Sequence, residues 1–204
     1  PRSTLFPYTT LFRSDLGYFE TKRDSEKIVV DACKAGKIDA VILNPSTIYG
    51  PGDSRKGSRK TQLKVAQGKF KFYTSGGVNV VPVENCVDGI IRAWTSGQTG
   101  ERYILAGQNL TIKELFQIIA DKAGVEAPKT KMPTAILHII GMIGDLLTSL
   151  GFRSPLSREN AYTATMFHWF DSGKAQRELG FQPGSSVQAI EQSIEWTRQK
   201  GLLS

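Results

Sequence analysis

Tyr18 and Lys22 are the residues in this sequence whose types and spacing are best suited to chemistry. On a helix, two residues four positions apart project from the same face, one turn apart. A lysine placed there lowers the pKa of a tyrosine phenol through its positive charge, and such a tyrosine can exchange a proton with a carbinol or carbonyl during hydride transfer. Six tyrosines and 15 lysines among 204 residues produce about 0.4 such pairs by chance, so the alternative is an ordinary tyrosine beside a surface lysine.

The elements around this pair are a long helix and a short buried strand. Apolar residues at helical spacing predict a helix over 15–37, with Gly36 at its end. The apolar run 38–45, IDAVILNP, predicts a strand that is buried on both faces, as in a parallel sheet. A helix followed by such a strand is half of a βαβ unit, so the sequence predicts an α/β fold. The next residues, 46–53, are predicted to form a Gly/Pro loop.

The rest of the chain is predicted to be mostly helical, with short strands. Thr111 and Glu114 have the spacing of a capping box, which predicts a helix over 111–124 that ends at Gly124. Further helices are expected near 58–67, 84–97, 133–150, 157–166, 172–179 and 185–200, and strands at 69–73, 78–83 and 100–107.

The tyrosine–lysine pair is followed by AVILNPSTIYGPGD (40–53), and this combination resembles the extended short-chain dehydrogenase/reductase family. In that family the active-site helix carries Tyr-x-x-x-Lys, and the next strand leads into a loop with Tyr-Gly-Pro-Gly-Asp. Further segments match the family in the same order, namely 76–94, 100–124 and 170–183. The resemblance covers about 15–204 and is strongest to the dihydroflavonol-4-reductase-like branch, so the implied fold is the C-terminal part of a Rossmann-type doubly wound parallel sheet plus a smaller, mainly helical substrate domain.

The resemblance implies a role for each site residue. Tyr18 would be the catalytic acid/base, and Lys22 would lower its pKa and bind the nicotinamide ribose. The backbone at Pro45, Ser46 and Thr47 would lie against the nicotinamide amide. The implied cofactor is NAD or NADP, and the implied reaction is hydride transfer to or from the carbonyl or carbinol carbon of a small-molecule substrate.

The Gly-rich turn that holds the cofactor pyrophosphate in this family is absent from the sequence, which contains neither G-x-x-G-x-x-G nor G-x-G-x-x-G. The stretch TLFPYTTLFRS (4–14) back-translates to a string similar to a widely used sequencing adapter. We therefore expect 1–14 to be foreign, 15–53 to be a remnant of the NAD(P)-binding domain, and 54–204 to be the substrate-binding part with some segments returning to the first domain.

Two rival functions remain open. Nucleotide-sugar epimerases and dehydratases of the family usually carry an Arg-Asp pair where this chain has Asn79 and Val80, which argues against a diphosphate-sugar substrate. The basic segment 54–71 could nevertheless bind phosphate. A non-catalytic NAD(P)-binding protein of the same fold is the second rival, and the presence of both Tyr18 and Lys22 counts against it.

Charge and cysteine content restrict the kinds of partner and the cellular compartment that we expect for this protein. The net charge is +7, and seven basic residues without an acidic one stand in 54–71, which we expect to be a solvated face or an anion site and not a nucleic-acid surface. Cys33 and Cys86 fit no metal spacing and are expected to be buried free thiols in a cytoplasmic protein. By analogy with the family, the helix face within 17–36 is the candidate homodimer surface.

The apolar stretch 133–151 contains His138 and Asp145, so it is expected to be a buried or amphipathic helix without a membrane partner.

The chain as given is expected to be unstable or to aggregate, because strand 38–44 would lack neighbours on its sheet and would expose edge hydrogen bonds. It is also expected to bind neither NADH nor NADPH, because the Gly-rich turn is absent. Light scattering and cofactor titration test this expectation. A cooperatively melting monomer that binds NADPH would contradict it.

Overall fold

The computed structural model describes residues 17–53, 60–152, 154 and 157–203, with the side chains of 17–19 left out of the description. The N-terminal foreign segment predicted from the sequence lies outside the described residues. The described helices are α2 (Gly17–Lys34), α3 (Lys60–Ala66), α4 (Val83–Ser96), α5 (Ile112–Ala123), α6 (Thr134–Ser149), α7 (Arg158–Thr163), α8 (Gly173–Leu179) and α9 (Ser186–Gln199). The described strands are β1 (Ile42–Pro45), β2 (Thr47–Tyr49), β3 (Phe72–Tyr73), β4 (Gly77–Pro82), β5 (Arg102–Leu105), β6 (Gln108–Thr111), β7 (Thr130–Lys131) and β8 (Phe167–His168).

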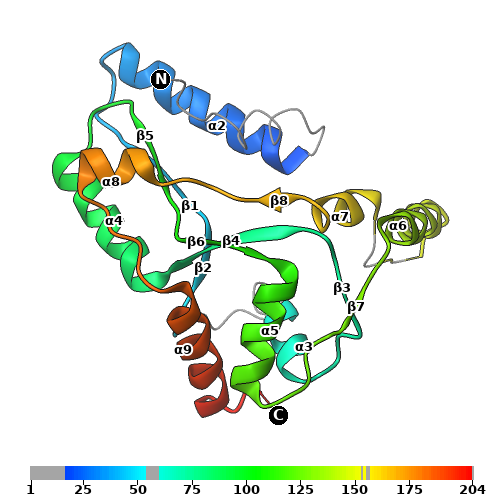
Figure 1. Ribbon diagram of the computed structural model, residues 1–204. Coiled ribbons are helices and arrows are strands. Elements are labelled where there is room, and N and C mark those ends of the chain that lie inside the picture. The colour runs from blue at the N-terminus through cyan, green and yellow to red at the C-terminus, as the bar shows by residue number, and fades with distance from the viewer. Residues whose placement is uncertain (1–16, 54–59, 153, 155–156, 204) are drawn as a thin grey trace.

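Parallel pairing dominates the sheets, as the α/β prediction requires. Strand β1 pairs in parallel with β5, and β3 pairs in parallel with β7. Strand β4 is central to the largest sheet, where it pairs in parallel with β2 and β8 and antiparallel with β6. Within the described part of the chain, the second edge of β1 has no strand partner. Figure 1 shows α2 at one end of the molecule, α5 and α9 at the other, and α6 projecting on a third side.

Strand β4 separates two hydrophobic cores. Successive side chains of a strand point to opposite faces, and Val80 and Val81 are both fully buried on opposite sides of β4. Val80 packs with residues of α3, α5 and α9, whereas Val81 packs with residues of α4, β5 and α8. The first core belongs to the predicted substrate-binding part, and the second supports the β1–β5 pair.

The helix over 111–124 is confirmed with its predicted cap. The Thr111 side chain accepts a hydrogen bond from the Glu114 backbone, and the Glu114 carboxylate accepts one from the Thr111 backbone. These hydrogen bonds from Thr111 also hold the pKa of Glu114 below its usual value. Gly124 ends the helix in the left-handed conformation at φ 76°.

Other predictions need correction. The segment 46–53 is not entirely a loop, because Thr47–Tyr49 forms β2 along β4. Strand 38–45 is paired only from Ile42 onward. Cys33 is partly exposed, whereas Cys86 is buried as expected.

Gly107 lies in the connection between β5 and β6, close to the backbone of β4. A Cβ atom there would lie 2.1 Å from the Val80 carbonyl oxygen and 3.0 Å from the Val81 Cα. We expect Gly107→Ala to lower the free energy of unfolding by about 3 kcal/mol, because backbone on both sides of the contact has to move. Urea unfolding followed by circular dichroism measures the change.

Gly124→Ala is the matched control, since its Cβ would enter open space and only the positive φ opposes it. We expect this variant to lose about 1 kcal/mol. Equal losses in the two variants would contradict the close-approach explanation.

Candidate functional site

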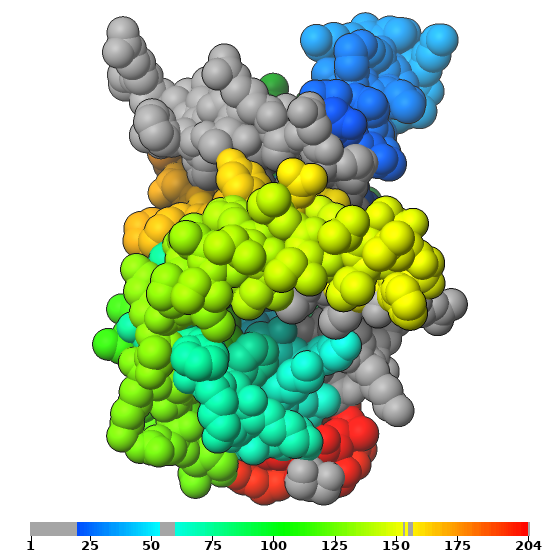
Figure 2. All heavy atoms as spheres, turned by 90° about the vertical axis from the view of Figure 1, so that its right-hand side faces the viewer, coloured from blue at the N-terminus to red at the C-terminus, as the bar shows by residue number. Residues whose placement is uncertain are grey.

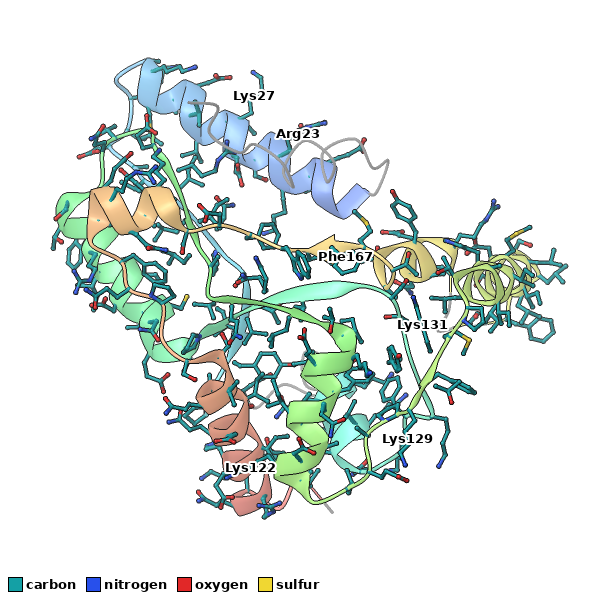
Figure 3. The ribbon with its side chains drawn as sticks, viewed as in Figure 1. Arg23, Lys27, Lys122, Lys129, Lys131 and Phe167 are labelled. Carbon is teal, nitrogen blue, oxygen red and sulfur yellow. The ribbon has the colours of Figure 1, made fainter. Side chains whose placement is uncertain are left out.

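Helix α2 carries both residues of the predicted catalytic pair. Tyr18 and Lys22 both lie within α2, so their spacing of four positions is helical. The side chain of Tyr18 lies outside the described side chains, and that of Lys22 is exposed. Figure 3 shows Arg23 and Lys27 on the outer side of α2, where each forms a surface ion pair, with Asp24 and Asp31 respectively.

The predicted nicotinamide-facing backbone lies where the chain changes sheets. Strand β1 ends at Pro45 and β2 begins at Thr47, which leaves Ser46 as the single residue between them. The Ser46 backbone N–H donates to the Leu105 carbonyl at 3.1 Å, which extends the β1–β5 pairing by one residue. In open α/β sheets, ligands bind at the carboxyl ends of strands near such a switch. Pro45, Ser46 and Thr47 therefore occupy a position suited to a cofactor.

The Glu26 carboxylate attaches α2 to both strands of the neighbouring sheet. Its Oε1 accepts a hydrogen bond from Asn44 Nδ2 on β1 at 2.7 Å. Its Oε2 forms an ion pair with Arg102 Nη1 on β5 at 2.6 Å, and only 16% of the Glu26 side chain is exposed. This connection constrains the rotation of α2 about its axis, and hence the direction in which Lys22 projects.

Sequence reasoning missed Glu26, Asn44 and Arg102. Glu26 lies four residues after Lys22 and eight after Tyr18, so helical spacing alone could have marked it as a member of the same face. Arg102 lies 76 residues further along the chain, and only the parallel β1–β5 pairing brings it close to Glu26.

Two buried polar atoms at the end of β1 fit a nicotinamide group. Within the described residues, Asn44 Oδ1 and Ser46 Oγ are buried without a hydrogen-bond partner. Buried polar groups are normally hydrogen-bonded, so this pair of atoms calls for a partner. A carboxamide or a ribose hydroxyl carries the donors that both oxygens can accept. The residues at this position are therefore chemically compatible with the nicotinamide end of NAD or NADP.

Two other tyrosines near the site are poor acid/base candidates. Tyr49, on β2, has its pKa raised above the usual range by burial and by the negative charge of Asp53. Burial also raises the pKa of Tyr103, on β5. Both phenols stay neutral near pH 7. Neither has the lowered pKa that lets a tyrosine donate a proton and recover it during catalysis.

Asn79, which the sequence resemblance predicts to stand where nucleotide-sugar enzymes of the family carry an arginine, is fully buried, and its amide group is hydrogen-bonded. Its Oδ1 accepts from the Gly107 backbone at 2.8 Å, and its Nδ2 donates to Asn109 Oδ1 at 2.6 Å and to the Gly107 carbonyl at 3.1 Å. The neighbouring Val80 is a core residue. This part of β4 therefore presents no cation and no spare donor to a diphosphate.

Strand β8 presents aromatic side chains beside β4. The rings of Phe167 and Trp169 stack edge to face at a centroid distance of 4.9 Å, and the Trp169 indole donates to the Leu110 carbonyl at 3.2 Å. Both residues remain partly exposed, at 49% and 39%. Figure 3 shows Phe167 on β8, between α2 and β4 in that view.

Metal binding finds no support in the part of the chain that the structure describes, where no group of three or more His, Cys, Asp or Glu residues could hold an ion.

Similarity to known proteins indicates one family. The model of the NAD dependent epimerase/dehydratase family matches residues 6–106. This match begins inside the segment 1–14, whose foreign origin stays a prediction.

Curated relatives agree with the family match. Sterol demethylase protein B of Methylococcus capsulatus is 29% identical over 196 residues, which are 94% of this chain and 60% of that protein. A protein of Synechocystis described as a putative dihydroflavonol 4-reductase is 26% identical over 190 residues, which are 90% of this chain and 55% of that protein. Among solved structures, gox2253 superposes with a TM-score of 0.78 at 30% identity, covering 92% of this chain and 57% of that one. The chain thus spans somewhat more than half the length of these proteins.

Replacing Glu26 tests whether it holds α2 in place. We expect Glu26→Ala to lower the free energy of unfolding by about 2 kcal/mol. Two charge-assisted hydrogen bonds are lost, and Asn44 Nδ2 loses the acceptor that Glu26 provides. Urea unfolding measures the loss, and hydrogen exchange should localise it to α2.

Asp31→Ala serves as the control on the same helix, because it removes only an exposed ion pair with Lys27. We expect its urea midpoint to match that of the unmodified chain. A Glu26→Ala variant that behaves in the same way would show that α2 is held by other contacts.

Proposed function

Because the chain belongs to the NAD dependent epimerase/dehydratase family of extended short-chain dehydrogenases/reductases, we propose that it contributes the proton-transfer half of an NAD(P)-dependent oxidoreductase site. The reaction is hydride transfer between nicotinamide and a carbonyl or carbinol carbon. The observation that carries this proposal is the Glu26 connection, which fixes the helix of Tyr18 and Lys22 against the end of β1.

Each residue has a defined task in this proposal. Tyr18 donates a proton to the substrate oxygen during reduction and removes it during oxidation. Lys22 lowers the Tyr18 pKa through its positive charge and binds the nicotinamide ribose. The backbone from Pro45 to Thr47 holds the carboxamide, and Glu26 keeps α2 in the orientation that these contacts require.

The cofactor, NAD or NADP, supplies or accepts the hydride when it is bound. The orphaned oxygens of Asn44 and Ser46 support a nicotinamide group at the end of β1. We further propose that the part of the relatives that this chain does not span provides the Gly-rich turn and covers the second edge of β1. Helix α4 also has an exposed apolar stripe, formed by Val87, Ile90, Ile91 and Trp94. We propose that the same part of the relatives covers this stripe.

A carbonyl substrate without a nucleoside diphosphate suits the site better than a nucleotide sugar. Asn79 and Val80 are buried and leave no cation on β4 to hold a diphosphate. The exposed aromatic rings of Phe167 and Trp169 favour an apolar substrate surface. Similarity to a protein described as a dihydroflavonol reductase supports the same choice.

A nucleotide-sugar epimerase or dehydratase is the second candidate, favoured by the family match. It would bind a nucleotide sugar in place of a simple carbonyl substrate. A non-catalytic NAD(P)-binding protein of this fold would not need both Tyr18 and Lys22.

A homodimer through α2 is also proposed. The outer surface of this helix carries Ile28, which is 71% exposed, among charged residues. Burial of Ile28 against a second copy would remove this apolar side chain from water.

Tyr18→Phe tests the proposed role in proton transfer, in the gene product that carries the Gly-rich turn. We expect kcat for reduction of aldehydes and ketones to fall about 100-fold or more, with the Kd for NADPH unchanged, because only the transferable proton is lost. Stopped-flow absorbance at the NADPH band and a fluorescence titration measure the two quantities.

Tyr73→Phe removes a phenol hydroxyl elsewhere and is the control expected to keep full activity. Retention of kcat in Tyr18→Phe would refute the acid/base assignment, whereas conversion of a nucleotide sugar by the unmodified enzyme would favour the second candidate.

A further inference from the structure

Helix α6 faces the solvent with its large apolar side chains and the protein with its small residues. Gly141 and Gly144 are its buried residues, and a Cβ atom on Gly141 would lie 2.9–3.0 Å from Ser157 and Arg158 backbone atoms at the start of α7. The outward residues, together with those that follow the helix, define the α6 apolar face: Ile136, Ile139, Met142, Ile143, Leu146, Leu147, Leu150 and Phe152. Each of them is between 41% and 65% exposed.

This arrangement is the reverse of an ordinary surface helix, which buries its large apolar residues and exposes polar ones. The single charged residue of α6, Asp145, is used locally, because its carboxylate accepts from the Arg158 guanidinium at 3.1 Å. Contiguous exposed apolar surface of this kind marks an interaction site, since it is costly to leave in water. The α6 apolar face therefore needs a partner.

Lysines are frequent in the segments that lie next to α6. Residues 60–73 carry four lysines and no acidic residue, and the paired strand β7 adds Lys131, three positions before α6 begins. Lys129 is the other lysine of this strand region, and it forms an ion pair with Glu126. Figure 2 shows α6 crossing one face of the molecule, with the segments of α3, β3 and β7 directly below it on the same face.

We propose that this face docks on an anionic membrane surface, with α6 lying in the plane of the interface and with Lys71, just before β3, and Lys131, on β7, next to lipid phosphate groups. Interfacial helices combine an apolar face with cations at its margin, and each basic residue near an anionic bilayer adds to the affinity. The proposal does not depend on the proposed function.

The length of α6 distinguishes docking from spanning. Its 16 residues extend about 24 Å, which is less than the ~30 Å of a bilayer's hydrocarbon core. No helix in the described ranges is long and apolar enough to cross a membrane. The expectation of no membrane partner rested on the polar interruptions of this segment, and these interruptions argue against a span but permit an interfacial helix.

Charge complementarity favours a membrane over a second copy of this chain. A two-fold dimer through the α6 apolar face places the same surface of both copies in contact, so the lysines of both copies would border one interface. Like charges along one interface repel each other, whereas anionic headgroups neutralise them.

Vesicle flotation tests the proposal, with the chain fused to a soluble carrier protein so that precipitation cannot hide binding. We expect the fusion to float with vesicles of 30% phosphatidylserine, roughly tenfold more than with pure phosphatidylcholine. Ile143→Glu combined with Leu146→Glu should reduce partitioning more than roughly tenfold. Lys71→Gln with Lys131→Gln should reduce partitioning on anionic vesicles toward the level on pure phosphatidylcholine, because each lysine contributes attraction to anionic headgroups.

Ile90→Glu combined with Trp94→Glu on α4 is the matched control, because it places two carboxylates on another exposed apolar stripe. This variant should float as the unmodified fusion does. The proposal is overturned by absence of flotation, by equal flotation of the α6 variant, or by equal binding to neutral vesicles. It is also overturned by a lipid-free dimer that Ile143→Glu with Leu146→Glu dissociates.

Discussion

The Glu26 carboxylate is the constraint on which the candidate site depends. One oxygen binds Asn44 on β1 and the other binds Arg102 on β5, so a single side chain joins α2 to both strands of a parallel pair. Two charge-assisted hydrogen bonds in different directions constrain the orientation of the helix on the sheet. The positions of Tyr18 and Lys22 relative to the end of β1 follow from this connection.

Strand β4 organises the rest of the structure around β1 and β5. Strand β4 carries a core on each face, and Asn79 secures the β5–β6 connection to it through hydrogen bonds with Gly107. The same burial and hydrogen bonding leave Asn79 without a spare donor for a ligand.

The long helices could be predicted from the sequence alone, but contacts between residues that are distant in the chain could not. Helix 111–124 was predictable because Thr111 and Glu114 cap it locally, and the helix of Tyr18 because its apolar spacing is regular. Strand β2 was missed because three residues between Pro45 and Gly50 become a strand only through pairing with β4. Glu26 was not recognised because its partner Arg102 is distant in sequence, and the outward face of α6 was not predicted because that helix is apolar on nearly every side.

The pH dependence of kcat/KM for carbonyl reduction, compared between the unmodified gene product and Lys22→Met, tests the central claim most directly. The account predicts that activity falls as the pH rises through the Tyr18 pKa, and that this pKa lies below the value of about 10 for free tyrosine. Lys22→Met should move the fall to higher pH, because the cation that favours the phenolate is gone. An identical profile in both proteins would contradict the account, since the proton would then come from a group that Lys22 does not influence.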